Sequence, residues 1–64
     1  MDNEKLLNMD PYILLSWANT KLRDEFDSLE ELCFEYGLKY EIIADRLKTI
    51  GYCYLKEINQ FKAS

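Results

Sequence analysis

The chain contains no histidine, and only two glycines, one proline and two cysteines occur among its 64 residues. Cys33 and Cys53 lie far apart rather than in a C-x-x-C arrangement, so no ordinary four-ligand zinc site can be assembled. A phosphate-binding loop needs a cluster of glycines, and no nucleophile is spaced from a base in a known catalytic pattern. We therefore predict that the protein is not an enzyme and uses no metal ion, cofactor or small-molecule substrate.

The chain also lacks a long apolar run and a signal peptide. Its longest apolar stretch, residues 12–15, is far shorter than the roughly 20 residues that span a membrane. The acidic start, residues 1–4, has neither the basic nor the apolar region of a secretion signal. We expect a cytoplasmic protein with free thiols and no membrane partner. A disulfide between Cys33 and Cys53 is the less favoured alternative.

Positive charge is scarce, since the net charge is −4. Residues 1–37 carry three basic and nine acidic side chains, whereas residues 38–64 carry five basic and three acidic ones. Lys and Arg contacts to phosphate supply most of the affinity for nucleic acid. The overall charge therefore makes nucleic acid an unfavourable partner, although the C-terminal part opposes it less.

What the sequence does contain predicts one small helical domain. A chain of this length buries only about 60% of its unfolded surface, so packing must be good or another chain must help. Residues 1–9 are expected to form a polar leader, because no signal starts a helix before Leu6. Residues 10–64 are expected to form a single helical domain with a C-terminal hairpin.

Start and stop signals predict three helices, over residues 11–26, 28–36 and 40–50. Asp10 can cap the first helix, with Pro11 at its first position. The second begins with a capping box, Ser28 to Glu31, and ends at Gly37 in a left-handed conformation. Gly51, with a positive φ, ends the third.

Apolar periodicity assigns the core face of each helix. In the first helix this face is Leu15, Ala18, Leu22 and Phe26, with Leu14 at its edge. In the second it is Leu29, Leu32, Cys33 and Tyr36. In the third it is Tyr40, Ile43, Leu47 and Ile50.

After Gly51 the period of two predicts short strands at residues 52–55 and 59–62. Residues 56–58 form the turn, and Asn59 takes a positive φ to close it. The predicted fold class is therefore mostly α: a three-helix, helix-turn-helix-like bundle followed by a short, wing-like C-terminal β-hairpin.

Two groups of residues carry a resemblance to a known family. The first runs through Met9-Asp10-Pro11-Tyr12, Leu14-Leu15-Ser16, Asn19, Lys21-Leu22-Arg23-Asp24, Ser28-Leu29 and Leu32-Cys33. The second is Gly51-Tyr52-x-Tyr54 followed by Asn59-x-Phe61. Together, from Met9 to Lys62, the chain resembles domain of unknown function family 4250, a family of small bacterial proteins. The resemblance implies a bacterial, cytoplasmic protein and brings no active site.

Several apolar residues fall outside the predicted core faces and form a candidate interface. These residues are Ile13, Trp17, Phe34 and Ile42. A contiguous set of exposed apolar side chains marks a binding surface, and Trp and Phe are frequent anchors. Alternatively, the hairpin or the leader covers Ile13 and Trp17. We expect a protein partner or a homo-oligomer.

A polar cluster on the first helix, around Lys21 and Arg23, is a second candidate contact, for phosphate or for an acidic partner. Its alternative role is local. Lys21 lies four residues before Glu25, and Arg23 lies four residues before Asp27, so both can pair on one helix.

The competing hypothesis is a winged helix-turn-helix DNA-binding regulator, in which the third helix reads DNA. Its predicted outward face carries Glu41 and Asp45, which repel phosphate. The cations left for contact are Arg46, Lys48, Lys56 and Lys62. Topology favours this hypothesis and electrostatics opposes it, so a protein-binding module is preferred.

Overall fold

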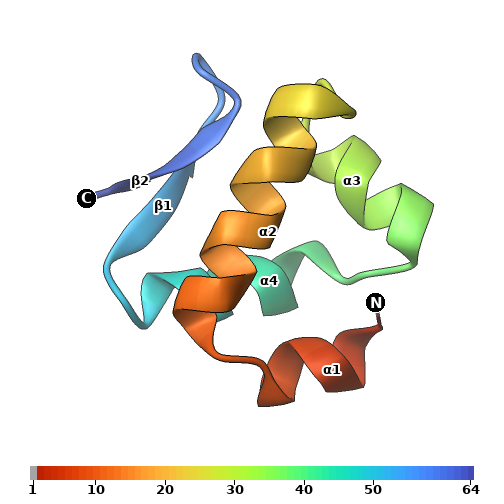
Figure 1. The fold of residues 1–64 in the computed structure, drawn as a ribbon, viewed down its shortest axis with the longest axis vertical. Coiled ribbons are helices and arrows are strands. Elements are labelled where there is room, and N and C mark those ends of the chain that lie inside the picture. The colour runs from red at the N-terminus through yellow and green to blue at the C-terminus, as the bar shows by residue number, and fades with distance from the viewer. Residues whose placement is uncertain (1) are drawn as a thin grey trace.

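In the computed structural model, which describes residues 2–64, helices are followed by a two-stranded antiparallel sheet (Figure 1). The elements are α1 (Asn3–Asn8), α2 (Pro11–Asp24), α3 (Leu29–Tyr36), α4 (Tyr40–Lys48), β1 (Tyr52–Leu55) and β2 (Gln60–Ala63). The predicted fold class, a mostly helical chain with a C-terminal hairpin, is confirmed. The three predicted helices are all present, and α1 precedes them.

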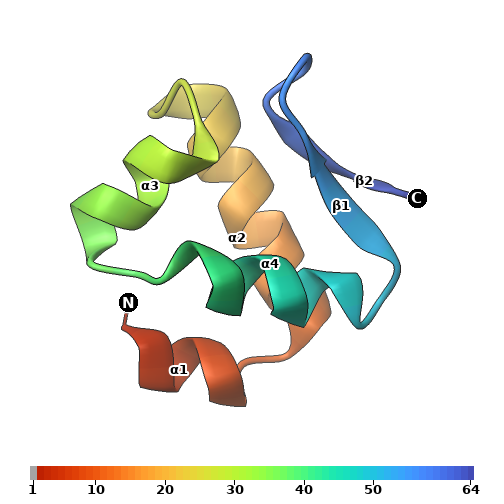
Figure 2. The ribbon, with the colours of Figure 1, turned by 180° about the vertical axis from the view of Figure 1, so that it is seen from behind.

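Helix α1 corrects the expectation that no helix starts before Leu6. The Asp2 carboxylate accepts a hydrogen bond from the Lys5 amide at 2.8 Å and caps the helix. Leu6 is 0% exposed and belongs to the core. A helix this short is stabilised by packing rather than by propensity, and α1 packs against α4 (Figure 2). Local sequence signals could not reveal that contact.

The helix caps follow the predicted chemistry closely. Asp10 accepts a hydrogen bond from the Tyr12 amide at 2.8 Å, with Pro11 at the first helical position of α2. Ser28 accepts one from the Glu31 amide at 3.1 Å, and Gly37 ends α3 with a φ of 66°. These local hydrogen bonds satisfy amides that have no partner inside the helix.

Five predicted boundaries shift by one or two residues, including the start of α3, which is Leu29, and the end of β2, which is Ala63. Helix α2 ends at Asp24 rather than at residue 26, and α4 ends at Lys48 rather than at residue 50. The chain then turns to Gly51, which has the predicted positive φ, at 80°. Strand β2 begins at Gln60, because Asn59, with a φ of 51°, is the last residue of the turn.

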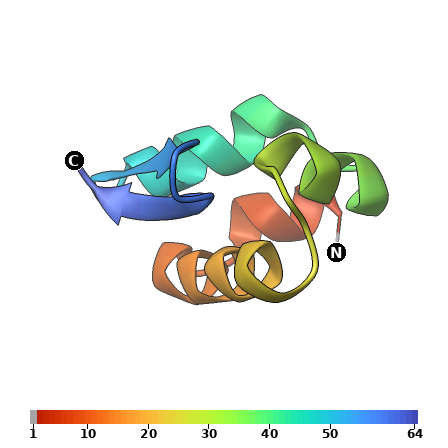
Figure 3. The same ribbon diagram turned by 90° about the horizontal axis from the view of Figure 1, so that it is seen from above.

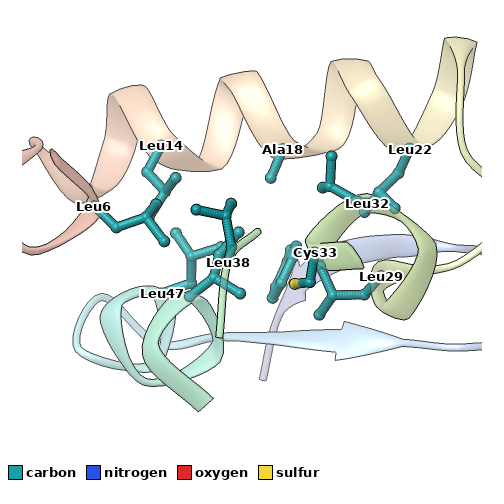
Figure 4. Close-up of a cluster of buried hydrophobic side chains, with 11 residues drawn as sticks. Leu6, Leu14, Ala18, Leu22, Leu29, Leu32, Cys33, Leu38 and Leu47 are labelled. Carbon is teal, nitrogen blue, oxygen red and sulfur yellow. The ribbon is translucent and has the colours of Figure 1, made fainter. Parts of the chain in front are cut away.

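All four helices and β2 contribute to one hydrophobic core (Figure 4). Its buried members are Leu6, Leu14, Ala18, Leu22, Leu29, Leu32, Cys33, Leu38, Ile43, Leu47 and Phe61. On α2 the buried face is centred on Leu14, Ala18 and Leu22, whereas Leu15 and Phe26 are only partly buried. Figure 4 shows Leu6 of α1 beside Leu14, so α1, which was not predicted, covers the side of α2 on which Leu14 lies.

The hairpin lies between α2 and α4. Strand β2 packs against α2 and β1 packs against α4, as the view from above shows (Figure 3). The register pairs Tyr54 with Phe61 and Cys53 with Lys62. Aromatic rings on the inner face, Tyr54 and Phe61, lie 5.5 Å apart and join the hairpin to the core.

Candidate functional site

Asn19 fixes the hairpin to α2 through its side-chain amide. Its Nδ2 donates to the Phe61 carbonyl oxygen at 3.2 Å, and its Oδ1 accepts from the Phe61 amide at 2.7 Å. Gln60 adds a bond in the other direction, because its Nε2 donates to the Asn19 carbonyl oxygen at 3.0 Å. The side chain of Asn19 therefore serves β2 as a neighbouring strand would.

Asn59 forms a second link, between the hairpin turn and the end of α2. Its Nδ2 donates to the carbonyl oxygens of Leu22 at 2.9 Å and Phe26 at 2.8 Å. Its Oδ1 accepts from the Tyr54 hydroxyl at 2.6 Å, and that hydroxyl oxygen accepts from the Leu29 amide at 3.2 Å. Asn59 and Tyr54, which belong to the residues that resemble the family, thus hold the hairpin against α2 and α3.

Lys21 and Arg23 are engaged locally. Lys21 Nζ lies 2.6 Å from the Glu25 carboxylate, as predicted, and the hydrogen bond to Glu25 raises the pKa of Lys21. Arg23 pairs with Asp24 at 2.9 Å rather than with Asp27, and this contact lowers the pKa of Asp24. Both pairs are solvent-exposed, so they add little to stability.

Trp17 has a neighbour that the sequence reasoning did not consider. Its ring meets Tyr36 of α3 edge to face, with centroids 5.2 Å apart. Trp17 is therefore partly buried against the core, whereas Ile13 is 62% exposed. Both line an open groove along α2 with Asp10, Tyr12, Ser16, Thr20 and Lys21.

The other two candidate interface residues have different surroundings. Ile42 is partly buried and packs against the core. Phe34 is 88% exposed on α3 and lines a separate hollow of about 380 Å³ with Phe26, Glu30, Glu31 and Glu35. The structure therefore brings Ile13 and Trp17 together and places Phe34 in a different hollow.

The surroundings of Phe34 are strongly acidic. Residues 24–38 include six acidic side chains and no basic one. Within residues 2–64, Glu30, Glu31 and Glu35 have no oppositely charged side chain in salt-bridge range. The spacing of Glu30 and Phe34, four residues apart on one helix, was the signal that could have found this site.

Both cysteines are free, so the alternative of a Cys33–Cys53 disulfide is not what the structure contains. Cys33 is 4% exposed, and burial, assisted by the charges of Glu30 and Glu41, raises the pKa of its thiol to about 11. Cys53 is partly exposed on β1. Thiolate chemistry at neutral pH is therefore disfavoured at Cys33.

Arg46, one of the four cations considered for DNA contact, is directed toward the protein's own backbone. Its Nη2 donates to the Met9 carbonyl oxygen at 2.6 Å and so ties α4 to the chain between α1 and α2. Its Nε is buried and has no hydrogen-bond partner within the part of the chain that the structure describes. Lys48, Lys56 and Lys62 are exposed.

Among residues 2–64, no helix has the length and apolar character needed to cross a membrane. In the same range, no group of three His, Cys, Asp or Glu side chains is arranged to hold a metal ion. Among the exposed large apolar side chains that the structure describes, Phe34 has the highest exposed fraction, and glutamates surround it.

Of three comparisons with known proteins, one finds a match. No curated protein matches the chain, and no solved structure does. A family model, described as Domain of unknown function (DUF4250), matches residues 8–61. That range includes α2 to α4, the hairpin turn and both asparagine links, and it begins at the last residue of α1. The chain therefore belongs to the DUF4250 family.

Proposed function

We propose that this protein is a non-enzymatic, cytoplasmic protein-binding module, and that the outer face of α3 docks a basic segment of a partner protein. The observation that carries the proposal is the exposure of Phe34, which is 88% accessible at the centre of an acidic surface. Phe34 contributes little to the core, which leaves its ring available to a partner.

The energetic argument starts from the ring itself. Burying a phenylalanine side chain stabilises a complex by about 1.5–3 kcal/mol relative to leaving it in water. Aromatic side chains are enriched at the centres of protein interfaces, surrounded by polar groups that exclude water. Phe34, with Phe26 beside it and glutamates around it, has this arrangement.

The charges define the occupant. Glu30, Glu31 and Glu35 flank Phe34, and they favour Lys and Arg on the partner and disfavour Asp and Glu. A short amphipathic helix with an apolar side chain between basic ones fits both requirements. Such a partner would associate faster at low salt, because complementary charges steer the encounter.

A synthetic amphipathic helix built from Lys and Leu, labelled for fluorescence anisotropy, is a direct probe of this face. The same peptide with Glu in place of Lys is its control. We expect the basic peptide to bind and the acidic one to fail, with affinity falling as salt is raised.

Variants of the protein locate the binding face. Phe34→Ala should abolish binding of the basic peptide, and the double variant Glu31→Gln/Glu35→Gln should weaken it. Ile58→Ala is the matched control, because Ile58 is also exposed but lies in the hairpin turn. If Phe34→Ala binds the basic peptide as tightly as the wild type does, this proposal is wrong.

A DNA-binding regulator is the second candidate, and its support is the topology. Helices α3 and α4 are joined by a short turn and followed by the hairpin, the element order of a winged helix-turn-helix. Against it, α4 exposes Glu41 and Asp45, and Arg46 bonds to the backbone. We expect no submicromolar binding to random or genomic duplexes at about 150 mM salt. Such binding would favour this candidate instead.

A further inference from the structure

The two edges of the hairpin differ in their hydrogen bonding. On β2, the outward N–H and C=O of Phe61 are both taken by the Asn19 side chain. Because these groups of Phe61 point away from β1, the Tyr54–Phe61 pair is a non-hydrogen-bonded pair of the ladder. The backbone groups of Tyr54, and of Tyr52 two residues earlier, therefore point away from β2.

These outward groups of β1 are unpartnered. Within residues 2–64, no hydrogen bond reaches the backbone N–H or C=O of Tyr52 or Tyr54. Figure 2 shows β1 on the near side of the hairpin, with β2 behind it. One edge of the sheet is thus closed by an asparagine, and the other presents two donors and two acceptors.

The open edge is short, but it carries no side chain of the kinds that discourage pairing. Natural edge strands commonly carry lysine, proline or a bulge that discourages another strand from adding. Strand β1 reads Tyr-Cys-Tyr-Leu, without charge or proline, and its register with β2 is regular.

We propose that β1 pairs in antiparallel fashion with β1 of a second copy of this chain, about a two-fold axis at Cys53. In this register Tyr52 faces Tyr54 of the second copy and Tyr54 faces its Tyr52. Each facing pair exchanges two backbone hydrogen bonds, so four form in total. The two hairpins become one four-stranded sheet, which is closed at both outer edges by Asn19.

The positions of the free groups favour a second copy over an unrelated strand. Only two residues of β1 offer outward groups, and inversion about Cys53 places both against their equivalents. A two-fold axis at Tyr52 or Tyr54 would instead place one tyrosine opposite Ile50 or Lys56, outside the strand. The chosen register also sets no like charges opposite each other, which would be unfavourable.

This pairing is expected to be weak and concentration-dependent. Four residues a side bury less surface than a standard stable interface, which needs about 800 Å² per partner. Sedimentation should therefore be followed up to the highest soluble concentration. In parallel, amide exchange at Tyr52 and Tyr54 should slow as concentration rises, whereas exchange at other exposed amides stays constant.

Cys53 reports the register directly. In a non-hydrogen-bonded antiparallel pair, facing Cα atoms lie about 4.5 Å apart, within the range that a disulfide spans. Treatment with copper(II) phenanthroline should cross-link the wild type and Cys33→Ala into dimers, because two copper(II) ions accept one electron each and the two thiol protons pass to water as the S–S bond forms. Cys53→Ser should give no cross-linked dimer, yet it should still associate in sedimentation.

Cys53→Glu supplies the decisive comparison, because it sets two carboxylates against each other across the axis, whereas within its own hairpin the new carboxylate lies opposite Lys62. We expect it to remain monomeric with a thermal melt like that of Cys53→Ser. Phe34→Ala should associate as the wild type does, which separates this inference from the α3 docking face. A wild type that is monomeric at every concentration overturns the proposal. So does a Cys53→Glu variant that still dimerises, or a Tyr52 amide protected only by an added extended peptide.

Discussion

The Asn19 side chain hydrogen-bonds both backbone groups of Phe61, accepting from its N–H at 2.7 Å and donating to its C=O at 3.2 Å. One amide thus replaces the pair of bonds that an adjacent strand would make. Phe61 is buried in the core beneath this contact. The link therefore fixes the position of an aromatic core residue as well as the edge of the sheet.

Replacing Asn19 by aspartate should destabilise the protein by about 1–3 kcal/mol. The carboxylate can still accept from the Phe61 amide, but it cannot donate to the carbonyl oxygen, which it repels. Urea unfolding measures the loss. Asn8→Ala is the control, because Asn8 makes an exposed bond within α1 and should shift stability by less than about 0.5 kcal/mol. Equal losses would contradict the proposed role of Asn19.

Asn59 combines a positive φ with three side-chain hydrogen bonds, and two variants separate these roles. Asn59→Gly keeps the backbone freedom and loses the bonds, whereas Asn59→Ala loses both. We expect the melting temperature to be highest for the wild type, lower for Asn59→Gly and lowest for Asn59→Ala. Tyr54→Phe should cost about 1 kcal/mol through the hydroxyl alone. If Asn59→Ala melts at a higher temperature than Asn59→Gly, the positive φ at residue 59 does not destabilise an alanine there.

Gly51→Val should destabilise by about 1–2 kcal/mol. The φ of 80° is unfavourable for any residue with a Cβ, although a Cβ here would meet no atom within 4 Å. The cost therefore arises between the new side chain and its own backbone, and not from neighbouring atoms. Thr49→Val, at an exposed residue of the same turn with a negative φ, is the control. Matching melts for Gly51→Val and the wild type would show that the turn can adopt another conformation.

Trp17→Ala should leave a folded protein that is less stable by about 1–3 kcal/mol, below the 3–5 kcal/mol typical of a fully buried aromatic residue. Trp17 is only partly buried, and the change removes its edge-to-face contact with Tyr36. Circular-dichroism melts and sedimentation test this together. A fall in apparent mass would show instead that a second chain covers Trp17.

The Cys33 thiol should make stability decrease at alkaline pH. Its pKa is raised from 9.0 to about 11 in the folded state, so the native protein keeps its proton where the unfolded chain loses it. The contribution of the neutral Cys33 thiol to the free energy of unfolding is therefore fully present below pH 9, and it is lost as the pH rises through about 11. Urea unfolding across this range should fall more steeply for the wild type than for Cys33→Ala. Parallel curves would show that Tyr40, whose pKa is also raised by burial, causes the decline.

Features with a local cause could be predicted from the sequence. The capping box at Ser28 and the positive φ at Gly51 and Asn59 depend on residues close by, and all three are confirmed. On α2 the prediction placed Ala18 and Leu22 in the core correctly, but it put Leu15 at the centre of the buried face and Leu14 at its edge, whereas Leu14 is the buried residue of the two. Leu14 is central because Leu6 packs beside it, and nothing near Leu14 in the sequence shows this.

The surface features divide in the same way. Phe34 was predicted to point outward from the period of α3 alone, and the structure leaves it 88% exposed. Trp17 was assigned to the outside of α2 from the helical period alone, which cannot reveal its contact with Tyr36 of another helix, α3. The partner of Asn19 is 42 residues away, a separation that no local pattern encodes.

The two asparagine links also bear on how the chain reaches its native state. The helix caps close within three residues, whereas Asn19 and Asn59 join segments 33 to 42 residues apart. Contacts between distant segments form only after a large loss of chain entropy, so they slow folding. The helices can collapse before the hairpin docks, and until it does, the buried position of Phe61 is empty. In kinetic measurements, variants of Asn19 should therefore accelerate unfolding more than they slow refolding.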